Sequence, residues 1–286
     1  MATLADYRSF SADGWRIQAL AERWNIQLQD QVLDLVRAQP AARHPQTVTL
    51  SGALDGVAKT HYLKIFHRRT IAAAAKDQLR DSRAQCFWRQ GIALSQAGFN
   101  VPLTIAVGGT GGWRIAKREF VVTEKIAGVA APVFLRCKEP VEPAEPIRKW
   151  QSLKQLAQLI RRFHQLGFVH GDLVASNIFV AVESSDYLKF YFMDNDRTRR
   201  YPSWLRQSLW KRNLIQLNRM PLPGISLQDR MRFLHAYLDE VRLSPRSRQL
   251  AQWLEKRTRR RRQEVDGADP NMSFRKLMRW FPEVAR

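Results

Sequence analysis

The stretch FVHGDLVASNIFVAVESSDYLKFYFMDNDRTRR, residues 168–200, is the part of the sequence that decides the fold expected for the chain. A His-Gly-Asp triplet ends at Asp172, Asn177 follows five residues later, and Asp194 comes after two apolar runs separated by a polar turn at 183–186. Apolar runs on either side of such a turn are predicted to pair as a β-hairpin. The hairpin would bring Asp172 and Asn177 close to Asp194 at one edge.

These three polar residues have side chains that suit a magnesium site with a nearby base. Mg²⁺ usually takes one or two protein carboxylates and fills its remaining positions with phosphate and water, so Asn177 and Asp194 are candidate ligands. Asp172, left off the metal, can accept a proton from an attacking hydroxyl. The alternative is a solvated loop with chance polar residues, and the spacing and flanking strands favour the site.

The same layout resembles the catalytic loop and metal-binding Asp of the protein-kinase-like superfamily. His-Gly-Asp stands in place of the commoner His-Arg-Asp, and Asp194-Asn195-Asp196 in place of Asp-Phe-Gly. The resemblance implies an α+β, bilobal protein-kinase-like fold, with a small β-rich N-lobe and a mostly helical C-lobe. We expect an N-terminal extension containing a helix at 1–45, the N-lobe at 46–126, and the C-lobe with a basic helical C-terminus at 127–286.

The composition predicts a basic globular protein. The chain has 286 residues, 45% of them hydrophobic, which is enough for one large or two small domains. Its formal charge of +21 predicts attraction to polyanions such as nucleic acid, an anionic membrane or a phosphorylated substrate. Two cysteines are too few for a disulfide framework. Without an apolar run of membrane-spanning length or a signal-peptide pattern, we expect a cytoplasmic protein, peripheral at the inner face of the membrane.

Lys64 is the candidate for the lysine that grips ATP phosphates in the small lobe. It lies in the second of two predicted strands, 47–50 and 60–66, which flank a turn at 52–56. A lone lysine in a strand is often simply solvent-facing. The position of Lys64, ahead of a long helix and well before the His-Gly-Asp triplet, favours the phosphate role.

The long helix predicted at 72–97 lacks the residue that usually pairs with this lysine. Kinase-like folds place a Glu on that helix, and this segment contains none. Asp77, Asp81 and Gln85 are the candidates for a substitute. The sequence does not choose between them.

The region that follows predicts a hairpin and a hinge. Strands at 103–107 and 114–124 surround a glycine run at 108–112, which lacks the Lys-Ser/Thr ending and following helix of a phosphate loop and so favours a turn. The sequence therefore leaves the phosphate-covering loop unidentified. The segment from 120 to 128 resembles the hinge between kinase lobes, which makes Glu124 and Ile126 candidate ATP-binding residues through their backbone.

Basic residues follow the presumed metal site and return near the C-terminus. Arg197, Arg199 and Arg200 are candidates for binding a phosphorylated acceptor, with a basic helix face as the alternative. Lys256 to Arg262 is a basic run that either faces solvent or contacts anionic lipid head groups. The helices expected in this half are at 147–167, 227–241 and 247–262.

Several motifs together resemble the bacterial lipopolysaccharide core and Kdo kinase family, over about residues 47–262. They are Tyr62-Leu63-Lys64, Val122-Thr123-Glu124, His170-Gly171-Asp172-Leu173 with Asn177, Met193-Asp194-Asn195-Asp196-Arg197, and the helical segments 211–219 and 229–234. The resemblance implies ATP and Mg²⁺ as cofactors, and transfer of the γ-phosphate to a sugar hydroxyl of the inner core, Kdo or heptose, at the cytoplasmic membrane face. It implies that Lys64 grips ATP, that Asp172 is the base, and that Asn177 and Asp194 hold metal.

Two other functions stay open at this point. One is a small atypical Ser/Thr protein kinase, because the His-Gly-Asp-Leu pattern also resembles that group; the other is a catalytically weak pseudokinase scaffold. Protein kinases spend some twenty residues on an activation segment ending in Ala-Pro-Glu, and here helices follow Asp194 almost at once. A phosphorylated glycolipid acceptor therefore fits better than a protein. No specific nucleic-acid partner is predicted, since only charge would support one.

Overall fold

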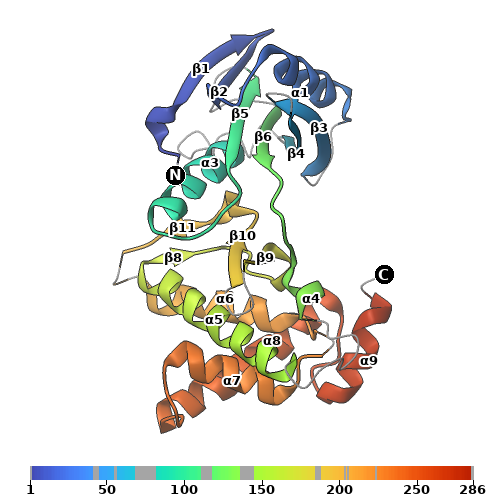
Figure 1. The fold of residues 1–286 in the computed structure, drawn as a ribbon. Helices are drawn as coiled ribbons and strands as arrows, with labels where there is room; N and C mark the ends of the chain where they lie inside the picture. Colours follow the sequence, from blue (N-terminus) through green and yellow to red (C-terminus); the bar gives the residue numbers. More distant parts are fainter. Residues whose placement is uncertain are drawn as a thin grey trace. The chain divides into compact units, whose positions relative to one another are not determined.

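Figure 1 shows the computed structural model of the chain. The structure describes residues 2–40, 45–54, 57–67, 82–110, 118–135, 145–183, 188–202, 204, 206–222 and 224–284. The chain divides into two compact units. The first comprises Met1–Ala127 with Tyr191–Arg197, and the second comprises Gly128–Phe190 with Thr198–Arg286.

The first unit is built on a six-stranded antiparallel sheet with the order β1-β2-β5-β6-β4-β3. Its strands are β1 (Tyr7–Ala12), β2 (Trp15–Leu20), β3 (Gln46–Leu54), β4 (Val57–His67), β5 (Thr104–Thr110) and β6 (Arg118–Glu124). The two strands predicted around Lys64 are β3 and β4, which pair directly and are longer than expected. The hairpin predicted around the glycine run is β5 and β6.

Two helices cover opposite faces of this sheet: α1 (Ile26–Ala38) and α3 (Arg83–Gln96) (Figure 1). Because side chains alternate along a strand, Phe120 and Val122 of β6 join the core cluster under α1. Val121, between them, joins the cluster under α3. Helix α3 covers the second half of the long helix predicted at 72–97, and residues 72–81 lie outside the described residues.

The stretch predicted as an N-terminal extension with a helix belongs to the sheet. The helix is confirmed as α1, which Asn25 caps by accepting a hydrogen bond from the Leu28 backbone N–H at 2.8 Å. Strands β1 and β2, however, were not predicted, and β2 pairs with β5. β1 is mostly exposed, so it lacks the alternation of apolar residues that indicates a strand.

The second unit is mostly helical. Its elements are β7 (Val129–Ala130), α4 (Ala131–Phe134), α5 (Glu145–Gln165), β8 (Phe168–Val169), β9 (Ile178–Val182), β10 (Leu188–Phe192), β11 (Arg199–Arg200), α6 (Arg206–Arg219), α7 (Leu227–Leu238), α8 (Pro245–Asp266) and α9 (Phe274–Val284). β9 and β10 are neighbours in a small sheet, which confirms the predicted hairpin, although β10 ends in the first unit. Short 3-10 turns complete the fold at Leu4–Asp6, Ala175–Asn177 and Asn195–Arg197.

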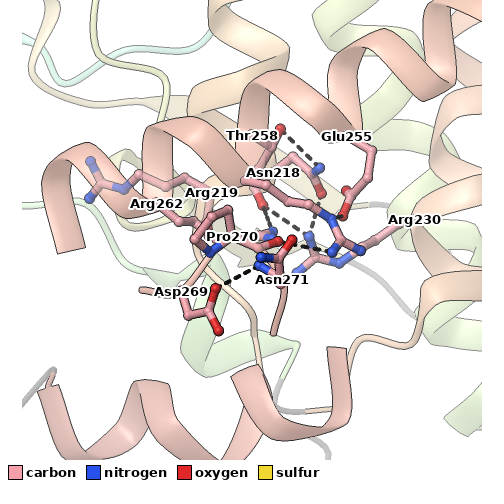
Figure 2. A network of polar contacts seen from close by, with 10 residues as sticks. Asn218, Arg219, Arg230, Glu255, Thr258, Arg262, Asp269, Pro270 and Asn271 are labelled. Atoms are coloured by element: carbon pink, nitrogen blue, oxygen red, sulfur yellow. Dashed lines mark hydrogen bonds and ion pairs between the residues drawn. The ribbon is translucent and has the colours of Figure 1, made fainter. Parts of the chain in front are cut away.

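Two arginines, the buried Arg262 and the half-buried Arg230, hold the C-terminal end of α6 (Figure 2). Arg262 of α8 donates to the carbonyl oxygens of Asn218 and Arg219, both at 2.7 Å, and Arg230 of α7 donates to that of Asn218 at 2.9 Å. Burial lowers the pKa of Arg230 to about 10, and the neighbouring Arg262 adds to the effect. The last carbonyls of a helix are unsatisfied and partly negative, so both cations are well placed there. Arg262 is therefore buried and does not belong to the exposed face of the basic run predicted at 256–262.

Candidate functional site

Lys64 and Asp194 form an ion pair within the first unit. The Lys64 Nζ atom lies 2.6 Å from Asp194 Oδ1. Lys64 lies between Leu63 and Ile65, which point into the core under α1, so its own side chain emerges on the α3 face of the sheet. The lysine side chain is only 14% exposed, whereas Asp194 is 48% exposed. The strand lysine and the second acidic residue of the sequence pattern are thus brought together.

The backbone of Asp194 has an uncommon conformation. Its φ angle is +54°, in the left-handed region that non-glycine residues seldom adopt. Hydrogen bonds fix the segment on either side. The Phe192 backbone N–H donates to the carbonyl of Asn100 at 2.9 Å, and the buried Asn195 side chain donates from Nδ2 to the carbonyl of Phe192 at 2.9 Å. The strained turn directs the Asp194 carboxylate to Lys64.

Asp172 and Asn177 lie together in the second unit. The Asn177 Nδ2 amide donates to the backbone carbonyl of Asp172 at 3.0 Å, and the Val174 N–H donates to the same carbonyl at 2.9 Å. Because the Asn177 nitrogen is engaged in this turn, its amide oxygen is the atom available to a ligand. Asn177 ends a 3-10 turn, and strand β9 begins at the next residue, Ile178.

The His-Gly-Asp loop is anchored by two polar side chains of α6 that the sequence did not single out. Asn213 Oδ1 accepts from the His170 N–H at 3.0 Å. Gln216 donates from Nε2 to the Gly171 carbonyl at 2.8 Å and accepts from the Leu173 N–H at 3.2 Å. The two anchors also bond to each other at 3.0 Å. Every residue around Asp172 in the loop therefore has a backbone group tied to one helix.

A buried histidine extends this anchor. His164 Nε2 lies 3.1 Å from Asn213 Oδ1, and its Nδ1 lies 2.9 Å from the Tyr237 hydroxyl. Burial lowers the pKa of His164 to about 4, against an opposing effect of the Asn213 hydrogen bond. Burial also raises the pKa of Tyr237. A neutral imidazole that donates from Nε2 and accepts at Nδ1 satisfies both contacts.

The other predicted ATP-binding residues lie at the end of β6. Glu124 forms an ion pair with Arg23, with Oε1 and Nη1 3.1 Å apart, and its backbone N–H donates to the carbonyl of Leu103. Ile126 follows the strand and is half-buried. Within the glycine run at 108–112, Gly108 lies in β5, where a larger side chain would collide with the ring of Phe120. Packing therefore requires glycine at position 108.

The three predicted acceptor-binding arginines differ in their surroundings. Arg197 is exposed at the end of a 3-10 turn in the first unit. Arg199 donates to the Thr198 carbonyl at 2.7 Å. Arg200 donates to the Leu166 carbonyl at 3.2 Å and its guanidinium lies 5.5 Å from the centre of the Phe168 ring. Arg200 is thus occupied in joining β11 to the end of α5.

The candidate metal ligands have the donor atoms that Mg²⁺ requires. They offer a carboxylate, Asp194, and an amide oxygen, Asn177, which is the hard-oxygen set that Mg²⁺ prefers. Within the described part of the chain, no group of three or more His, Cys, Asp or Glu side chains could hold a metal ion.

Comparison with known proteins identifies the kind of chain this is. The model of the lipopolysaccharide kinase (Kdo/WaaP) family matches residues 34–237. No curated protein matches the chain by sequence. Among solved structures, WaaP in complex with acyl carrier protein is 21% identical, with a TM-score of 0.56 over 79% of this chain and 91% of that one. The PknI kinase domain of Mycobacterium tuberculosis is 13% identical, with a TM-score of 0.32 over 100% of this chain and 98% of that one. The likeness to WaaP confirms the kinase-like fold.

Proposed function

Because the chain belongs to the lipopolysaccharide kinase (Kdo/WaaP) family, we propose that it transfers the γ-phosphate of ATP to a sugar hydroxyl of the lipopolysaccharide inner core, on Kdo or heptose. The chain is a kinase, and membership of this family implies the use of ATP. The acceptor class rests on the family match. The observation that carries the phosphate transfer is the ion pair of Lys64 with Asp194, because it joins the cation proposed to bind phosphate to the carboxylate proposed to bind metal.

Each residue has a distinct task in the proposed reaction. Lys64 binds the phosphates of ATP. When no ATP is bound, its ion pair with Asp194 keeps the ammonium group extended. Asp194 and Asn177 would hold Mg²⁺, which neutralises charge on the phosphates when bound. Asp172 accepts the proton of the sugar hydroxyl as that oxygen attacks phosphorus. The hydrogen bonds from α6 hold the loop around Asp172, so that the carboxylate need not be reorganised in each turnover.

The acceptor is tested by offering labelled ATP to the purified protein together with separate pools of lipopolysaccharide and protein. We expect label in lipopolysaccharide. Acid release of sugars followed by mass spectrometry then distinguishes a phosphorylated Kdo from a phosphorylated heptose. Label that appears only in protein would contradict the glycolipid acceptor and favour the atypical protein kinase.

We further propose that the exposed face of α8 contacts the anionic surface of the cytoplasmic membrane. Trp253 is 38% exposed, and its ring centre lies 5.2 Å from Lys211 Nζ and 5.5 Å from the Arg257 guanidinium. Aromatic rings and basic side chains are the residues that favour a charged lipid interface. None of the helices in the described ranges is long and apolar enough to cross a membrane.

Some cations of α8 already pair with acidic residues, and the others are the ones proposed to contact lipid. Arg259 pairs with Glu255 at 2.8 Å, and Arg260 pairs with Glu264 at 3.0 Å. Lys256 and Arg257 are exposed and lie beside Trp253. We call Lys211, Trp253, Lys256 and Arg257 the lipid-facing cluster. Each cation near an anionic surface contributes about 1 kcal/mol.

An acyl carrier protein is proposed as a second partner. The WaaP structure is a complex with acyl carrier protein, and the second unit here contains a cavity of about 400 Å³. Its walls are mostly apolar and include Leu156, Leu214 and Leu234 from α5, α6 and α7. A pocket with such walls suits an aliphatic chain. Thermal unfolding with an acylated and an unacylated carrier protein tests this, since a ligand that binds the folded state raises its stability.

A further inference from the structure

Helix α3 meets the metal-binding segment through an arginine. Arg83, in its first turn, donates from Nε to Asp196 Oδ2 at 2.8 Å and also from Nη2 to the same oxygen. The side chain of Asp196 is only 4% exposed. A buried carboxylate is costly unless it is paired, and this guanidinium supplies a charged partner for Asp196.

Two cations, Lys64 and Arg83, lie beside the ring of Phe66 in β4. The centre of this ring lies 5.6 Å from Lys64 Nζ and 5.0 Å from the guanidinium carbon of Arg83. Two cations beside one ring repel each other, and each is stabilised by its own anion. Asp194 serves Lys64, and Asp196 serves Arg83. The spacing of the Asp-Asn-Asp triplet thus matches two cations, one from the strand and one from the helix.

The Arg83 contact also restrains the strained residue. A left-handed conformation such as that of Asp194 is unfavourable for a non-glycine residue and persists only where neighbouring contacts impose it. On one side of Asp194, the backbone is fixed through Phe192. On the other side, Asn195 and Asp196 are held, the latter by Arg83. Without Arg83, one of these restraints is lost and Asp194 can relax.

We infer that Arg83 is a positioning residue, which fixes Asp196 and thereby holds Asp194 in the conformation that binds metal. This inference rests on the proposed function for its catalytic consequence. The sequence raised Asp77, Asp81 and Gln85 as substitutes for the missing helix Glu. Of these candidates, Asp77 and Asp81 lie outside the described residues. Through Arg83 the helix contacts the Asp-Asn-Asp segment with reversed polarity, because the helix residue is the cation and the loop supplies the carboxylate.

The test compares Arg83→Ala and Arg83→Lys with the natural protein in two measurements. Loss of a residue that orients a metal ligand typically lowers metal affinity or activity about 10- to 100-fold. We expect Arg83→Ala to lower kcat and raise the Mg²⁺ concentration for half-maximal rate within that range, with a smaller change in KM for ATP. Arg83→Lys keeps the charge but loses the two-nitrogen contact, so an intermediate effect is expected.

The second measurement needs neither ATP nor magnesium. Hydrogen exchange of the ligand-free protein, followed by mass spectrometry, should be faster at residues 192–198 in Arg83→Ala and unchanged in α1. The matched control is Arg37→Ala, which removes another Arg–Asp pair of the first unit, 2.6 Å to Asp13, far along the sequence from the Asp-Asn-Asp triplet. It should change neither measurement.

The outcomes separate this inference from the proposed function. If the natural protein phosphorylates no lipopolysaccharide, the proposed function fails, while hydrogen exchange still tests the role of Arg83. Unchanged exchange at 192–198, together with unchanged magnesium dependence, would overturn the inference. Faster exchange spread evenly through the unit would also overturn it, because that indicates a general structural role. Arg83→Lys carries the test if Arg83→Ala does not fold.

Discussion

The replacement of Gln216 by methionine tests how the catalytic loop is held. Methionine has a similar length but no polar atoms, so it leaves the Gly171 carbonyl, the Leu173 N–H and the Asn213 amide without these partners. A hydrogen bond contributes about 0.5–1.5 kcal/mol net, and the 3.2 Å bond to Leu173 less than the others. We therefore expect the free energy of unfolding to fall by about 2–3 kcal/mol.

The same change should reduce catalysis more than nucleotide binding. If about 1–3 kcal/mol of loop positioning is lost in the transition state, kcat falls about 5- to 150-fold. Lys64 and Asp194 belong to the other unit, so the Kd for ATP should stay within about twofold. The measurements are urea unfolding, single-turnover transfer from labelled ATP, and calorimetric titration with a non-hydrolysable ATP analogue.

A matched substitution controls for the change in side-chain chemistry. Gln263→Met on α8 replaces an exposed glutamine and should leave stability and kcat unchanged. The reasoning is refuted if Gln216→Met loses stability but keeps full kcat, because the loop would then hold its geometry without this anchor. It is refuted equally if the Kd for ATP weakens as much as kcat falls.

Three further predictions concern the base, the buried histidine and the lipid-facing cluster. Asp172→Asn should keep the fold and ATP binding but lower transfer about 10²- to 10⁴-fold, measured with labelled ATP. Burial lowers the pKa of His164 from 6.5 to about 4, so between these pH values the unfolded state binds a proton that the folded state does not. The free energy of unfolding should therefore fall as the pH drops from 6.5 to 4, by at most about 1.4 kcal/mol per pH unit. Urea unfolding should show a smaller loss in His164→Gln. Replacing both Lys256 and Arg257 by Glu should abolish sedimentation with vesicles of phosphatidylglycerol, whereas vesicles of neutral phosphatidylcholine should bind neither protein.

Each of these predictions has an outcome that contradicts it. Full transfer activity in Asp172→Asn would remove Asp172 from the role of base. A pH dependence of stability that is identical in His164→Gln would assign the acid sensitivity to other groups. For the lipid-facing cluster, the control is Arg260→Gln, because Arg260 already pairs with Glu264. Equal losses of vesicle binding in the control and the double variant would indicate general charge attraction.

Much of the fold could be predicted, and candidate residues for the site could be named, because the signals are local. The His-Gly-Asp triplet, the Asn five residues later and the alternating strands of residues 178–192 are patterns within a short window, and the structure confirms the strands. The amphipathic pattern of α1 is equally local. Edge strand β1 escaped prediction because an exposed strand needs no apolar alternation, and its pairing with β2 is what makes it a strand.

The anchors of the site could not be predicted for a different reason. Asn213, Gln216 and Arg83 are polar residues on helices, and a polar residue at helical spacing is normally expected to face solvent. Their roles depend on partners about 40 to 113 positions away in the sequence. Nothing in a window around Arg83 indicates that Asp196 is buried against it.

The sequence by itself therefore predicted the chemistry proposed for this protein, because the ability of a side chain to accept a proton, bind magnesium or bind phosphate belongs to the residue type and its spacing. Only the tertiary structure decided how those side chains are held. The pairing of Lys64 with Asp194, the reversed contact from Arg83 to Asp196 and the attachment of the catalytic loop to α6 are all contacts between distant segments. Such contacts arise from packing, which brings together residues whose local sequences carry no record of one another.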